Sequence, residues 1–172
     1  MPNIANIPEE MIEEHVHWHT REGNPADGGR AIVPWLPGRV EPTPGSGEEF
    51  LVWHGGYIDR FMGWVDSLPE SERPDGTTIA PWTSIPAGFK MGMLGWNQSR
   101  AREELLLQDI ANFGTHDELG RFLEWGLHGF LHSAAAGMFN ESIIMSWESP
   151  RSTYFWQLHG LIEHWSQTWK NT

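Results

Sequence analysis

Two histidines at helical spacing constrain the fold of this chain most strongly. His128 and His132 are four residues apart, so on a helix they share one face and lie within reach of a common ion. His159 follows 27 residues later and completes a set of three if its helix packs against theirs. Three neutral imidazoles suit copper, zinc or iron and leave positions open for a small ligand. The pattern predicts helices packed around a metal.

A second histidine cluster lies in the N-terminal half. His15, His17 and His19 are close together, and His54 lies well downstream. His15 and His19 share a helix face, whereas His17 points roughly opposite on a regular helix. We therefore predict His15, His19 and His54 as a second ligand set, with His17 as the alternative if the helix end near Gly23 is irregular. Two such clusters suggest a paired-metal site.

Length and composition exclude several classes of protein. The 172 residues fit a single domain, residues 1–172, that buries a sizeable core. The net charge of −12 makes nucleic acid a poor partner. There is no cysteine, which excludes disulfides, zinc–thiolate sites and thiol catalysis. Eleven tryptophans and eight phenylalanines predict an aromatic core.

Targeting signals are not visible in the sequence. The acidic N-terminal stretch lacks a basic segment followed by an apolar run, so we expect no signal peptide. No segment is apolar for long enough to span a bilayer, and we expect no membrane partner. These features predict a cytoplasmic protein, with secretion through a partner protein as the alternative.

The hydrophobic periodicity predicts an all-α fold: a small helical bundle of about four core helices, two long irregular loops, and the metal site between helices. Capping-box patterns at Ser46 with Glu49 and at Thr115 with Glu118 mark two helix starts. The predicted helices cover residues 9–22, 46–66, 99–113, 115–136 and 153–169. The Gly- and Pro-rich stretches 23–47 and 67–98 are the predicted long loops, and residues 137–152 form a shorter one.

The second histidine set lies in a longer motif that resembles one protein family. The chain has a His-x-x-x-His helix, a Gly-Met pair, a Ser-Pro pair and an aromatic pair before the last histidine: Leu127–His132, Gly137-Met138, Ser149-Pro150 and Tyr154–His159. This order is similar to the second copper half of tyrosinases, catechol oxidases and molluscan haemocyanins. The resemblance makes His159 the third ligand, and the family's following acid becomes Glu163.

The first half of the chain resembles the same family more weakly. Residues 50–57 read Phe-Leu-Val-Trp-His-Gly-Gly-Tyr and resemble the family's Phe-Leu-Pro-Trp-His-Arg-x-Tyr, with His54 as ligand. The family histidine nine residues earlier is Gly45 here, and the arginine after the ligand is Gly55. The remaining ligands of this half must then come from the cluster at residues 15–19.

The resemblance implies a type 3 dicopper oxidoreductase with two copper ions as cofactors. Two cuprous ions supply one electron each to dioxygen, and small phenolic substrates, ortho-diphenols or ortho-aminophenols, leave as quinones or quinone-imines. Weaker hydroxylation of monophenols is a further expectation. A copper-delivery protein is considered as a partner.

Three residues are candidates for catalytic roles. Glu163, one turn after His159, is a candidate to orient that imidazole. Family members that hydroxylate monophenols often carry Asn where this chain has Gly129, paired with a Glu that activates water. Glu118 is the candidate for that acid. Two alternatives stay open: a copper- or dioxygen-binding protein without turnover, and a mononuclear zinc or nickel hydrolase that uses His54, His128 and His132.

Overall fold

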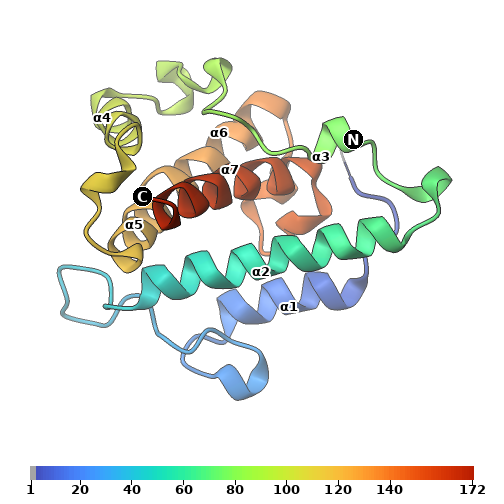
Figure 1. Ribbon diagram of the computed structural model, residues 1–172, viewed down its shortest axis with the longest axis horizontal. Coiled ribbons are helices and arrows are strands. Elements are labelled where there is room, and N and C mark those ends of the chain that lie inside the picture. The colour runs from blue at the N-terminus through green and yellow to red at the C-terminus, as the bar shows by residue number, and fades with distance from the viewer. Residues whose placement is uncertain (1–2) are drawn as a thin grey trace.

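The computed structural model describes residues 3–172 as helices joined by turns and loops (Figure 1). The α-helices are α1 (Glu9–Thr20), α2 (Ser46–Ser67), α3 (Gly76–Ile79), α4 (Gln98–Leu107), α5 (His116–Leu123), α6 (Gly129–Phe139) and α7 (Thr153–Lys170). Short 3-10 helices cover Pro25–Asp27, Glu70–Glu72, Ala87–Phe89, Gly92–Leu94, Ile110–Asn112, Ser142–Met145 and Ser149–Arg151. Within the described residues, β pairing is limited to an isolated bridge. The predicted all-α helical bundle is confirmed.

The core of the bundle is built from α1, α2, the α5–α6 segment and α7. Figure 1 shows α1 and α2 running side by side, with α7 on the other side of α2. Trp18 of α1 stacks on Trp53 of α2 with ring centroids 4.6 Å apart. Phe61 of α2 stacks on Trp156 of α7 at 3.5 Å. Aromatic rings therefore bind the core helices to one another, as the composition predicted.

A π-helical turn, Glu124–His128, joins α5 to α6 and makes residues 116–139 one continuous helical segment. The prediction of a single helix from residue 115 to 136 was close, and the helix ends instead at Phe139, before Asn140 in the left-handed conformation (φ 52°). Turns of this kind are rare and concentrate at functional sites. This one ends on His128, so it fixes the angle at which that side chain leaves the helix.

Two glycines allow α2 and α5 to cross in direct backbone contact. A Cβ on Gly120 would lie 2.0 Å from the carbonyl oxygen of Gly47, and a Cβ on Gly47 would lie 2.1 Å from the nitrogen of Arg121. Neither position tolerates a side chain at that separation. The crossing also brings the Oδ1 atom of Asp117 to the backbone N–H groups of Gly47 and Glu48, at 2.9 and 3.3 Å.

The start of α2 differs from the prediction. Ser46 is the first helical residue rather than the cap, and its buried hydroxyl has no hydrogen-bond partner. Glu49 turns its carboxylate to the backbone N–H groups of Ala31 and Ile32. The predicted capping box at Ser46 was therefore wrong, because Asp117 of α5 supplies the acceptor for the first turn. The cap at Thr115 is confirmed, since its side chain accepts from the N–H of Glu118.

The other helix boundaries lie within a few residues of those predicted. The segment expected at 99–113 divides into α4 and a separate 3-10 turn at Ile110–Asn112. The two long loops are present and contain only short helical turns. Among residues 3–172, no helix combines the length and the apolar character needed to cross a bilayer.

Candidate metal centre

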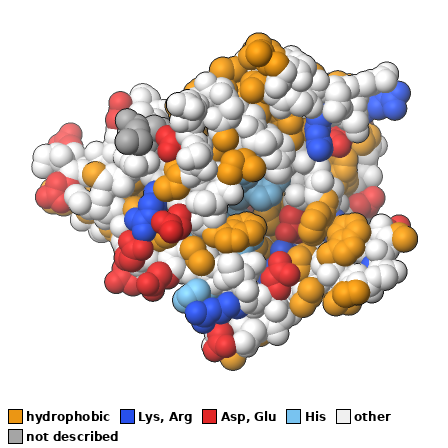
Figure 2. Space-filling model, turned by 180° about the vertical axis from the view of Figure 1, so that it is seen from behind, with side chains coloured by type: hydrophobic (Ala, Val, Ile, Leu, Met, Phe, Trp, Pro, Cys, Tyr) orange, Lys and Arg blue, Asp and Glu red, His pale blue; other side chains and the backbone are white. Residues whose placement is uncertain are grey.

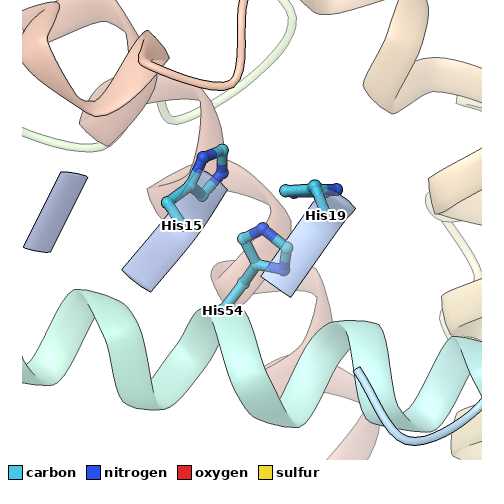
Figure 3. A group of neighbouring side chains, drawn as sticks. All are labelled: His15, His19 and His54. Carbon is cyan, nitrogen blue, oxygen red and sulfur yellow. The ribbon is translucent and has the colours of Figure 1, made fainter. Parts of the chain in front are cut away.

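The first histidine group comes from α1 and α2. His15 and His19 lie one turn apart on α1, and His54 reaches them from α2, so that the three imidazoles converge (Figure 3). Their ring nitrogens can all lie within 4.8 Å of one another. His15 and His54 are almost completely buried. The three residues predicted for the N-terminal set are therefore brought together.

His17, the alternative ligand, lies outside this group. Its Nε2 atom is 2.9 Å from a guanidinium nitrogen of Arg21, and its side chain packs against Gly28. Because α1 is regular through this turn, His17 points away from the face that His15 and His19 share. The structure thus groups His15 and His19, and not His17, with His54.

The second group comes from the helical segment 116–139 and from α7. His128, His132 and His159 also place one ring nitrogen each within 4.8 Å of the others. The Nε2 atom of His132 lies 3.1 Å from that of His128 and 3.4 Å from that of His159. Two imidazole ligands about 2.0–2.1 Å from one tetrahedral ion have their nitrogens about 3.3 Å apart. The spacing of this group fits a single metal ion.

The two groups are in direct contact. The rings of His54 and His159 stack with centroids 4.6 Å apart and planes 10° apart. His54 thus belongs to the α1–α2 group by its ligand atoms and touches the other group by its face. His54 does not form a group of this kind with His128 and His132, the set considered above for one zinc or nickel ion.

Backbone carbonyls fix the tautomers of several of these rings. The Nδ1 atoms of His15, His54 and His132 donate to the carbonyls of Trp147, Phe50 and Ile144, at 2.6, 2.9 and 2.5 Å. A carbonyl only accepts, so the proton of each neutral ring lies on this side and the other nitrogen presents a lone pair.

These lone pairs point toward the neighbouring imidazoles. The Nε2 atom of His132 lies 3.1 Å from that of His128, and His132 already donates from Nδ1 to the carbonyl of Ile144. The Nε2 atom of His54 is buried without any partner. Unsatisfied buried acceptors are costly, and a cation between them removes the cost. The donor set therefore fits one metal ion in each group.

Burial keeps all six imidazoles neutral. Desolvation is the largest cause in each case: it lowers the pKa of His15 to about 3 and that of His132 to about 4. The same cause, together with neighbouring imidazoles, lowers the pKa of the other four well below 6.5: His19, His54, His128 and His159. Metal ligation requires the neutral ring, so these groups are ready to bind near neutral pH.

A buried ion pair holds the π-helical turn. Arg30 is 1% exposed and contacts Glu124 at 2.6 Å, and its guanidinium also lies over the ring of Trp18. Burial raises the pKa of Glu124, opposed by its hydrogen bond to Arg30. Glu124 begins the turn that ends on His128. Arg30 therefore anchors the backbone that presents one ligand.

An open pocket leads to both groups. It has a volume of about 250 Å³ and reaches His15 and His19 on one side and His128 and His132 on the other. Its outer wall is the segment Ile144–Trp147, which also supplies the carbonyls for His15 and His132. Figure 2 shows histidine side chains at the bottom of a hollow, with hydrophobic side chains beside it.

The three candidate catalytic residues lie in different surroundings. Gly129 lines the pocket, and a Cβ added there would meet no atom within 4 Å. Glu163 accepts from Gln167 and faces Gly55, while the Nδ1 atom of His159 is buried without a partner. Glu163 therefore does not orient His159 through a hydrogen bond.

Glu118 does not reach the pocket. It is exposed in the first turn of α5, ten residues before His128, which is about 15 Å along a helix. Its carboxylate accepts from the N–H of Gly114 at 2.9 Å. The expectation that Glu118 supplies an acid beside position 129 is not met by this geometry, because its role is to cap the helix.

Three residues around the site were missed by the sequence analysis: Arg30, Glu124 and Trp147. Arg30 and Glu124 are 94 residues apart, and neither belongs to a recognisable motif. Trp147 stacks on His19 with centroids 4.4 Å apart. Its place seven residues before Tyr154, within the stretch that resembles the copper-protein motif, was the one signal in the sequence that could have indicated it.

No protein-family model, characterised protein or solved structure matches the chain.

Proposed function

We propose that this protein is a type 3 dicopper oxidoreductase that uses dioxygen to oxidise small ortho-diphenols or ortho-aminophenols. The observation that carries the proposal is the pair of contacting histidine triads, His15–His19–His54 and His128–His132–His159, whose nitrogens converge in two groups. Copper is favoured over zinc by the all-imidazole donor set in two adjacent groups and by the motif resemblance from Leu127 to His159.

In this proposal the chain holds two copper ions, and the pair supplies reversible one-electron chemistry at each ion when bound. Each ortho-diphenol loses two electrons and two protons and becomes an ortho-quinone. Two diphenols thereby reduce one dioxygen to two waters, so atoms and electrons balance without another reductant. The neutral imidazoles tolerate both charge states of copper, and the backbone carbonyls keep their lone pairs directed inward.

The open pocket favours an enzyme over a protein that only binds copper or dioxygen. A protein that only binds copper or dioxygen needs no opening for an organic ligand, whereas this pocket reaches both triads from solvent and is lined mainly by apolar atoms. Trp147 and Met145 stand at its outer wall. A flat aromatic ring that enters between them approaches both groups of histidines.

Oxygen uptake tests the proposed reaction. Protein loaded with copper should consume one dioxygen for every two molecules of 4-methylcatechol, and zinc-loaded protein should consume none. If protein that retains two coppers per chain takes up no dioxygen with 4-methylcatechol or 2-aminophenol, the proposed oxidase activity is wrong. A copper- or dioxygen-binding protein without turnover is then the better-supported function.

A further inference from the structure

The size of the pocket limits what enters it. Its volume is about 250 Å³. A benzene ring fills an engineered cavity of about 150 Å³, and pockets for drug-sized ligands begin near 300 Å³. The pocket therefore has room for one aromatic ring with a short substituent, and a fused or two-ring phenol would have to leave much of its surface outside.

Away from the histidines, the walls of the pocket carry no formal charge. Among the described residues that line it, none is Lys, Arg, Asp or Glu. The remaining walls are apolar or hydroxyl side chains, such as Ile144, Met145 and Ser146. An anionic substituent on a bound ring would lose water here without gaining a cationic partner.

The charges just outside the pocket are unfavourable for anions as well. Glu148 directly follows Trp147 in the chain, and the nearby cation Arg151 is shared between Glu148 and Glu9, at 2.9 and 2.6 Å. This cluster carries a net negative charge, and so does the chain as a whole, at −12. The field of the molecule thus repels anions from the entrance.

We infer that the pocket selects single-ring ortho-diphenols that are neutral or cationic and discriminates against rings that carry a carboxylate. The inference rests on the proposed oxidase, because the diphenol end is taken to face the two triads and the substituent to face the wall. Trp147 is the specificity-determining residue: its indole is 51% exposed, and it forms the wall beside His19.

Three matched catechols measure this selectivity. They are 3,4-dihydroxyphenylacetamide (neutral), 3,4-dihydroxyphenylacetate (anionic) and 2-(3,4-dihydroxyphenyl)ethylamine (cationic), whose substituents differ little in size. With copper-loaded protein, we expect kcat/KM for the anion to be at least about tenfold below that for the amide, and the amine to equal or exceed the amide. A carboxylate used as well as the amide, or better, overturns the inference.

Binding to the metal-free protein gives a second readout that does not need the reaction. Ions at the triads would add positive charge, so the metal-free protein reports the walls alone. Titration calorimetry and tryptophan fluorescence should give the same order of affinity for the three catechols. The proposed function fails if no dioxygen is consumed; the selectivity fails if the anion binds the metal-free pocket as tightly as the amide, or if no catechol binds it.

Substitutions at the wall sharpen the test. Gly129→Lys places a cation at a position where an added Cβ would meet no atom within 4 Å, and it should raise the affinity for the anion about tenfold relative to the uncharged Gly129→Met. Trp147→Ala should weaken all three catechols several-fold. Trp35→Ala, which removes an indole of comparable exposure (41%) outside both this pocket and the π-helical turn, should change none of them. Equal effects of the two tryptophan substitutions would show that Trp147 does not determine the specificity of the pocket.

Discussion

The Nε2 atom of His132 lies 3.1 Å from that of His128 and 3.4 Å from that of His159, so His132 contacts both other members of its triad. We therefore predict that His132→Ala lowers the copper content from two ions to one per chain, because the α1–α2 group keeps its own three ligands. Elemental analysis after desalting measures this.

His17→Ala is the matched control for that substitution. It also removes a histidine, but one whose ring contacts Arg21 outside the triads. It should leave two ions per chain. Unchanged copper content in His132→Ala would refute the assignment of His132 as a ligand.

A second prediction at the scale of one residue concerns Gly129 and the lack of a base beside it. No carboxylate lines the pocket among the described residues, and Glu118 is committed to Gly114, so a monophenol finds no base to take its proton. General bases contribute about 10²–10⁴-fold to such steps. We expect initial rates on 4-methylcatechol at least about tenfold above those on 4-methylphenol, and Gly129→Asn alone should not close the gap. Equal rates in the wild type would place a base elsewhere.

At the scale of elements, the π-helical turn depends on the ion pair between Arg30 and Glu124. Arg30→Ala leaves a buried carboxylate without its partner, and we expect a loss of about 3–5 kcal/mol in the free energy of unfolding. Arg60→Ala removes a comparable contact with Glu14 at the surface and should cost less than about 1 kcal/mol. Urea unfolding of the metal-free proteins compares the two, and similar losses would show that the buried pair does not anchor the turn.

The elements also show what a sequence reveals and what it does not. The pairs His15–His19 and His128–His132 were predictable, because a four-residue spacing on a helix depends only on local geometry. The Ser46 cap was mispredicted because the acceptor for the first turn comes from Asp117, 70 residues after Gly47, whose N–H it accepts from. The carbonyls of Phe50, Ile144 and Trp147 that set the tautomers belong to the backbone, which leaves no mark in residue identity. The grouping of His54 with His15 and His19 was predicted, although it is the packing of α1 against α2 that brings the three side chains together.

For the whole molecule, the buried histidines predict how stability depends on pH. The pKa values of His15 and His132 lie near 3 and 4 in the folded state, below the ordinary 6.5. Below pH 6.5 the unfolded chain binds protons that the folded protein does not, so the free energy of unfolding falls as pH drops from about 6.5 to about 4. Each group contributes up to about 1.4 kcal/mol per pH unit.

Urea unfolding of the metal-free protein at pH 7.5, 6 and 5 tests this dependence. His132→Ala should reduce the slope between pH 6 and 5 by close to one proton, whereas His17→Ala should not. A slope that is the same in the wild type and in His132→Ala would mean that His132 is not kept neutral by the fold.

The central claim is that two contacting triads hold a pair of copper ions. The most direct measurement combines copper content with electron paramagnetic resonance on one sample of protein loaded with cupric ions and desalted. The account predicts two coppers per chain and little cupric signal, because two adjacent ions couple and cancel it. One tightly bound copper per chain with the full signal of an isolated cupric ion would contradict it.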